Sequence, residues 1–144
     1  MEPIIKWYED SRSTTYTIEL CDEQFTGKSF CHPDDDDMAS RRTGEHIAEA
    51  RAIMQAIKFY RKHYLRPQLD ALRQARYSME QAGVTEGVEV LDKQINKLER
   101  ILRATKKELV QTKRDLTKYI QDKDIFYNRI RAIRSSGQDD LINE

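Results

Sequence analysis

The strongest pattern in the sequence is a seven-residue repeat of apolar positions over residues 88–134. Two positions of each repeat form the pattern, and eleven of these fourteen residues are apolar. The first set is Val88, Ile95, Leu102, Leu109, Leu116, Lys123 and Ile130, and the second set is Leu91, Leu98, Thr105, Thr112, Tyr119, Phe126 and Ile133. Because this stretch contains no Gly or Pro, it predicts one long α-helix with a coiled-coil seam.

Three polar residues interrupt the seam, namely Thr105, Thr112 and Lys123. Polar residues at core positions of a coiled coil commonly fix the register and the number of partners. A second interpretation is that Thr105 and Thr112 leave a polar gap where a ligand could enter. Both interpretations stay open from the sequence.

Residues 40–82 also show helical spacing. Their apolar stripe consists of Ile47, Ala50, Met54, Ile57 and Tyr64, and it continues at Leu69, Leu72 and Met79. Pro67 predicts a kink or the start of a new helix. Gly83 suits the position after a helix end, and Thr85 suits the cap of the next helix. Because the connection has only about five residues, we expect neighbouring antiparallel helices.

Residues 1–39 show strand periodicity instead. A β-rich run begins at Ile4, residues 15–20 alternate between polar and apolar, and residues 24–31 form a returning strand. A tight turn is expected at Asp22 and Glu23, which would pair Leu20 with Phe25. In that register Cys21 and Cys31 lie at opposite ends of the pairing, so a disulfide between them is disfavoured.

These patterns together predict an α+β fold. A small antiparallel three-stranded β-meander head with an acidic loop, residues 1–39, would pack on a long antiparallel helical hairpin or coiled coil. The hairpin would consist of a first helix over residues 40–82, kinked at Pro67, and a coiled-coil helix over residues 88–134. Residues 135–144 would form a flexible tail.

The composition agrees with long exposed helices, since 35% of the residues are charged and 38% are hydrophobic. The formal net charge is zero, but it divides along the chain. Residues 1–37 carry −7, residues 38–82 and 83–134 carry +5 each, and the last ten residues add three acids. This division suits two arrangements equally well, head-to-helix contacts in an oligomer and an anionic ligand held on the helices.

Several function classes are disfavoured. Cys21 and Cys31 lack the spacing of a zinc site, and the four aspartates at 34–37 after His32 suit helix capping better than metal binding. His46 and His63 lie about 25 Å apart along a helix, too far for a catalytic pair. We therefore expect no enzyme activity, catalytic residue, metal or cofactor. Without a secretory signal or a long apolar segment, we expect a cytoplasmic protein with reduced thiols and no membrane contact.

A binding site is better supported than a catalytic one. An anionic nucleotide needs positive charge for its phosphates, an aromatic face for stacking and an amide for the base edge. Basic residues on the first helix and a mixed cluster near the end of the last helix supply these groups. The candidate ligand-binding residues are Arg51, Arg61, Tyr127, Asn128, Arg129 and Arg131. The competing interpretation is a solvated helix face in which Phe126 alone joins the seam.

Two segments carry a resemblance to known proteins. Residues 27–35, GKSFCHPDD, and residues 43–52, TGEHIAEARA, resemble a strand-to-helix signature of small proteins from bacteriophages that infect Gram-positive bacteria. They also look like the double-stranded-RNA-binding-like fold of small proteins linked to ribosome hibernation. Among phage proteins of this build, the resemblance to anti-Thoeris sponges implies sequestration of a cyclic ADP-ribose signal without catalysis, in a dimer or larger ring. It transfers no ligand-binding residue onto this chain.

Three functional hypotheses follow. The first is a non-catalytic phage anti-defence protein that sequesters a cyclic ADP-ribose-like or other cyclic nucleotide signal and associates with itself. The second is a protein inhibitor of a bacterial effector such as a CRISPR nuclease. The third is a nucleic-acid- or ribosome-binding accessory protein, which ranks last because the head that would read the nucleic acid is acidic.

Overall fold

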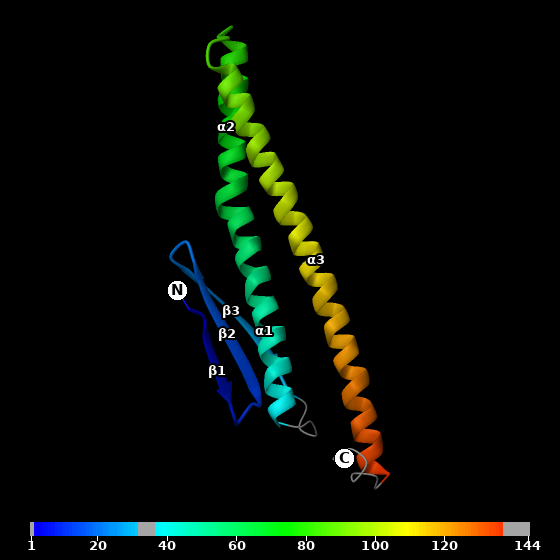
Figure 1. The fold of residues 1–144 in the computed structure, drawn as a ribbon. Coiled ribbons are helices and arrows are strands. Elements are labelled where there is room, and N and C mark those ends of the chain that lie inside the picture. The colour runs from blue at the N-terminus through cyan, green and yellow to red at the C-terminus, as the bar shows by residue number, and fades with distance from the viewer. Residues whose placement is uncertain (1, 32–36, 137–144) are drawn as a thin grey trace. The chain divides into compact units, whose positions relative to one another are not determined.

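The computed structural model describes residues 2–31 and 37–136 (Figure 1). The strands are β1 (Ile4–Tyr8), β2 (Ser13–Leu20) and β3 (Glu23–Phe30). The helices are α1 (Asp37–Tyr60), the π-helical segment η1 (Arg61–Leu65), α2 (Arg66–Gln81) and α3 (Val88–Ser135). The predicted α+β class, the three-stranded antiparallel sheet and the long last helix are thus confirmed. His32, Asp34 to Asp36 and all but the first two residues of the predicted tail lie outside the described residues.

The chain forms two compact units. The first unit comprises Met1–Gln55 and Thr112–Glu144, and the second comprises Ala56–Gln111. The sheet, the first part of α1 and the C-terminal half of α3 therefore belong to the first unit. The second unit is helical in its described elements, with the end of α1, η1, α2 and the first half of α3.

The sheet has the strand order β1-β2-β3, and both pairs are antiparallel. The turn between β2 and β3 consists of Cys21 and Asp22, both with positive φ (54° and 62°), as a two-residue hairpin turn requires. Leu20 therefore pairs with Glu23, and Phe25 pairs with Ile18. The predicted turn at Asp22 and Glu23 was wrong by one residue, which slides the register by two.

The alternation of polar and apolar residues could not reveal this shift in strand register. A shift of two residues keeps the same side chains on each face of a sheet, because successive side chains alternate. Phe25 faces the core in either register and is 8% exposed. The cysteines still lie at opposite ends of the hairpin, since Cys21 is in the turn and Cys31 follows the far end of β3.

Close backbone approach joins β3 to α1 in the first unit. A Cβ atom on Gly27 would lie 2.6 Å from the Ala52 nitrogen and closer still to the Ala48 carbonyl oxygen. Ala48 and Ala52 are 0% exposed. These small residues form a buried face of α1 that the sequence prediction missed, while Ile47 on the predicted apolar stripe is half-buried.

The α3 seam follows the predicted positions with one exception. Thirteen of the fourteen residues are buried or half-buried. Phe126 is 51% exposed, however, and its neighbour Tyr127 is 7% exposed, so the assignment of Phe126 to the seam was wrong. A straight α-helix drifts about 20° per seven-residue repeat. The five repeats between Leu91 and Phe126 therefore add about 100°, or one residue, which moves the buried position to Tyr127.

In the second unit, Pro67 marks the start of α2, and two glycines lie in the connection between α2 and α3. Pro67 lies in the first turn of α2, directly after the π-helical segment. At the end of α2, Gly83 has φ +69°, its N–H donates to the Glu80 carbonyl, and the next N–H donates to the Met79 carbonyl. This is a Schellman motif, and it confirms the prediction for Gly83. Gly87 (φ +82°), not Thr85, precedes the first residue of α3, so the predicted cap was wrong.

Candidate functional site

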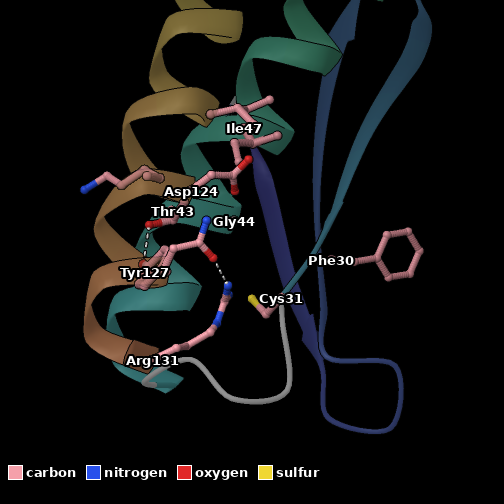
Figure 2. Close-up of a pocket in the computed structure, with 11 residues that line it drawn as sticks. Phe30, Cys31, Thr43, Gly44, Ile47, Asp124, Tyr127 and Arg131 are labelled. Atoms are coloured by element: carbon pink, nitrogen blue, oxygen red, sulfur yellow. Dashed lines mark hydrogen bonds between the residues drawn. The ribbon is translucent and has the colours of Figure 1, made fainter. Parts of the chain in front are cut away.

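The first unit contains a pocket of about 360 Å³ (Figure 2). Its walls come from the end of β3, the start of α1 and the C-terminal half of α3. The lining residues are Phe30, Cys31, Thr43, Gly44, Ile47, Ile120, Lys123, Asp124, Tyr127, Asn128 and Arg131. The volume falls in the range of small-molecule sites, about 300–1,000 Å³.

The sheet fixes the start of α1 at one side of this pocket. Ser29 Oγ donates to the Gly44 carbonyl oxygen over 2.9 Å. A Cβ on Gly44 would lie 2.9 Å from Ser29 Oγ and 3.0 Å from Thr14 Oγ1, so a larger residue would crowd these two side chains. Arg51 adds a second link, since its Nη1 donates to the Lys28 carbonyl over 2.7 Å. The sheet thereby sets the position of Thr43, one residue before Gly44.

A buried hydrogen bond then joins α1 to α3. Thr43 Oγ1 and the Tyr127 hydroxyl are 2.9 Å apart, and the two residues are 8% and 7% exposed. Figure 2 shows the two side chains pointing toward each other across the helices. Because each hydroxyl satisfies the other away from water, the bond specifies the helix register.

Two cations and one carboxylate give the pocket a net charge of +1. Arg131 Nη1 donates to Asn128 Oδ1 over 2.7 Å, which orients the guanidinium and the amide together. Lys123 Nζ lies 5.5 Å from the centre of the Tyr119 ring and 5.9 Å from that of Phe126. Asp124 is the acid of the lining. Such a surface can take an anion through the cations while the Asn128 amide fixes its orientation.

The structure divides the six predicted ligand-binding residues. Tyr127, Asn128 and Arg131 line the same pocket. Arg129 is exposed and does not line it, and Arg51 bonds to the backbone of β3. Among the pocket residues that the prediction missed, Thr43 lies in the TGE segment of the resemblance and Lys123 is one of the three polar interruptions of the seam. Both signals were present, but nothing in the sequence joined them to Tyr127.

The sixth residue, Arg61, belongs to the second unit. It is 9% exposed, and its Nη1 donates to the Leu102 carbonyl and, over 2.6 Å, to Thr105 Oγ1. Burial and, second, the charge of Arg66 lower the pKa of Arg61 from its usual value. The gap predicted at Thr105 is therefore filled by this guanidinium, and Thr105 serves the helix pairing.

His46 and Tyr16 do not line the pocket. The rings of His46 and Tyr119 lie 4.1 Å apart between centroids. The pKa of Tyr16 is raised by burial and, to a smaller extent, by the charges of Glu49 and Glu45. Within residues 2–31 and 37–136 there is no group of three or more His, Cys, Asp and Glu side chains that could hold a metal. Among the described residues, no helix has an apolar stretch long enough to cross a bilayer.

Comparisons of the chain with family models, curated proteins and solved structures give no match. What the chain binds must therefore be inferred from the chemistry of its own surfaces.

Proposed function

We propose that this chain is a non-catalytic binding protein that sequesters a small anionic nucleotide in the first-unit pocket. The proposal rests on one observation, that a single pocket of about 360 Å³ is lined by Tyr127, Asn128, Arg131 and Lys123. Cations for phosphate and a hydrogen-bonding amide are the groups that orient such a ligand. The resemblance to phage sponge proteins makes a cyclic ADP-ribose-like or cyclic nucleotide immune signal the first ligand to test.

Sequestration without turnover agrees with how the polar groups of the pocket are used. The Thr43 and Tyr127 hydroxyls bond each other, and Asn128 accepts from Arg131. A nucleophile needs an adjacent general base within hydrogen-bond reach, whereas the Thr43 and Tyr127 hydroxyls are bonded to each other. These groups are suited to hold a ligand in one orientation.

Calorimetry with cyclic ADP-ribose isomers and cyclic dinucleotides tests the proposal. We expect binding in the micromolar range or tighter by the wild-type chain, and at least a tenfold loss of affinity in Arg131→Gln. Arg129→Gln is the matched control, because Arg129 is two residues away and exposed but outside the pocket lining. Melting curves of both variants verify folding. No heat at high micromolar ligand, or equal losses in the two variants, would overturn the proposal.

We further propose that the helices act as a coiled-coil scaffold, in the form of a long antiparallel hairpin that associates with a second copy. Supporting observations are the half-buried seam residues of α3, such as Leu91, Leu98 and Leu102, which retain exposed apolar surface. Light scattering at several protein concentrations tests the association. A mass equal to one chain at all concentrations contradicts it, without affecting the ligand proposal.

The alternative function, inhibition of a bacterial effector such as a CRISPR nuclease, has one observation in its favour. Ile125 and Phe126 are adjacent on α3 and are 53% and 51% exposed. Exposed apolar side chains next to each other are common at protein interfaces. A pull-down from host lysate with wild type and with Phe126→Ser distinguishes this function, since it requires one stoichiometric partner that the variant loses.

A further inference from the structure

The two units carry opposite net charges. The second unit has twelve Lys and Arg against seven Asp and Glu, or +5, and the first unit has thirteen against eighteen, or −5. The zero charge of the whole chain therefore conceals a strongly basic second unit. Charges separated by more than about 8 Å are largely screened at physiological ionic strength, so a ligand responds mainly to the charges near its own site.

Four of the twelve cations of the second unit lie together on α3. A shallow hollow of about 680 Å³ is lined by Lys93, Asn96, Lys97, Glu99, Arg100 and Arg103. We call Lys93, Lys97, Arg100 and Arg103 the basic face. Its first and last members are ten residues apart, or about 15 Å along the helix. The cations thus form a line and do not converge on one point.

A neighbouring hollow extends this charge toward α2. It shares Glu99 and Arg103 with the first and adds Arg66 and Arg73, with Asp70 as its other acid. Arg73 binds Glu99 over 2.9 Å, which occupies that carboxylate. The ion pair between Lys93 and Glu89 is long, at 4.0 Å, and exposed, so Glu89 neutralises little of the Lys93 charge.

No aromatic side chain lines either hollow. Nucleobases are held by stacking on aromatic rings, so these surfaces are suited to phosphates alone. A line of cations matches an extended chain of phosphates better than a single compact phosphate. Phosphate contacts hold a protein on nucleic acid without reading its sequence.

We propose that the basic face of α3 binds the phosphate backbone of duplex nucleic acid without sequence specificity. This inference is independent of the proposed nucleotide pocket, since the residues belong to different units. It gives the third functional hypothesis a location, on the helices and not on the acidic head.

The test is fluorescence anisotropy with two 20-base-pair DNA duplexes of unrelated sequence. If four cations contact phosphates, the affinity falls about 100-fold between 50 and 200 mM salt. Both duplexes should bind alike. Absence of binding at 50 mM salt, binding that does not depend on salt, or stronger binding to single strands than to duplexes would overturn the proposal.

Charge-reversal variants locate the contact. Lys97→Glu with Arg100→Glu should weaken binding at least tenfold and reduce the salt dependence by about half. The control is Lys113→Glu with Arg114→Glu, which makes the same change of net charge at exposed positions of the same helix outside both hollows. We expect the control to change affinity less than threefold, and equal losses in the two variants would overturn the assignment. Circular dichroism verifies helix content, and both variants should keep the ligand affinity of the first-unit pocket.

Discussion

The two units stabilise their helix pairs by different means. In the first unit a sheet supports α1, and packing excludes water so well that Ala48 and Ala52 are fully buried. In the second unit the described helices lack such a support. Their contacts include three polar links between the helices, made by Arg61 with Thr105, Arg73 with Glu99, and Arg76 with Asp92.

The difference shows what a third layer adds to a pair of helices. The α3 seam residues of the second unit are all half-buried, although Leu65 and Leu69 of the same unit are 2% and 4% exposed. Apolar burial, worth about 25 cal/mol per Å², is then incomplete, and directional bonds must fix the register. We therefore expect the first unit to be most sensitive to changes of volume and the second to loss of polar partners.

The largest effect should come from Gly27→Ala in the first unit. The added Cβ would meet the backbone of α1 at Ala48 and Ala52, and backbone atoms cannot move without displacing the helix. We expect a loss of about 3 kcal/mol in the free energy of unfolding, measured by urea titration. Gln24→Ala, at an exposed position of the same strand, should cost less than about 0.5 kcal/mol. Equal effects would contradict the close approach.

Arg61→Leu should be the most damaging polar change in the second unit. It removes the charged donor to Leu102 and Thr105, and we expect a loss of about 2 kcal/mol. Adding Thr105→Leu should recover most of that loss, because a buried polar pair replaced by apolar residues of similar size is often neutral. Urea titration measures both variants, with exposed Arg66→Leu as the control. A double variant less stable than Arg61→Leu would contradict this role of Arg61.

The Thr43 to Tyr127 bond should contribute less. Thr43→Val and Tyr127→Phe each leave one buried hydroxyl without its partner, so we expect each to cost about 1 kcal/mol. The double variant should cost little more than either single variant, because both hydroxyls are then gone. A double-mutant cycle in urea measures this coupling, and additive losses would show that the bond does not stabilise the fold.

The smallest effect concerns Tyr16 on the sheet. Its pKa is raised above 10.0 in the folded chain, by burial first and by Glu49 and Glu45 second. Above about pH 10 the unfolded chain loses this proton before the folded chain does, so stability must fall as the pH rises toward the folded pKa. Tyr16→Phe should lose less stability than wild type between pH 9 and pH 11. Identical pH profiles of the two proteins would show that the pKa of Tyr16 is not raised in the folded chain.

Much of the fold was predictable because periodicity depends on local sequence. The alternation around Tyr16 and Ile18 predicted a strand, and the repeat from Val88 onward predicted α3. The contact of Gly27 with Ala48 and Ala52 was not predictable, since alanine is common on exposed and buried helix faces alike. The shift from Phe126 to Tyr127 required knowing that α3 follows the straight-helix period and not the seven-residue one.

The candidate site was predictable only in its residue types. Tyr127, Asn128 and Arg131 are close in sequence, and a helix places them within reach of one another. Thr43 is 84 residues from Tyr127, and Arg61 is 44 residues from Thr105, so their partners depend on how the helices pair. A cation at a long-range contact and a cation in a binding site look the same in the sequence.

The Schellman motif at Gly83 has a practical consequence for engineering. Residues 83–87 are all exposed, and two glycines with positive φ lie between the helices, with Gly83 after the end of α2 and Gly87 directly before α3. An epitope or a fluorescent protein inserted between Thr85 and Glu86 should therefore be accommodated without remodelling either helix. That position would allow the protein to be followed in living cells with the pocket and the basic face left unmodified.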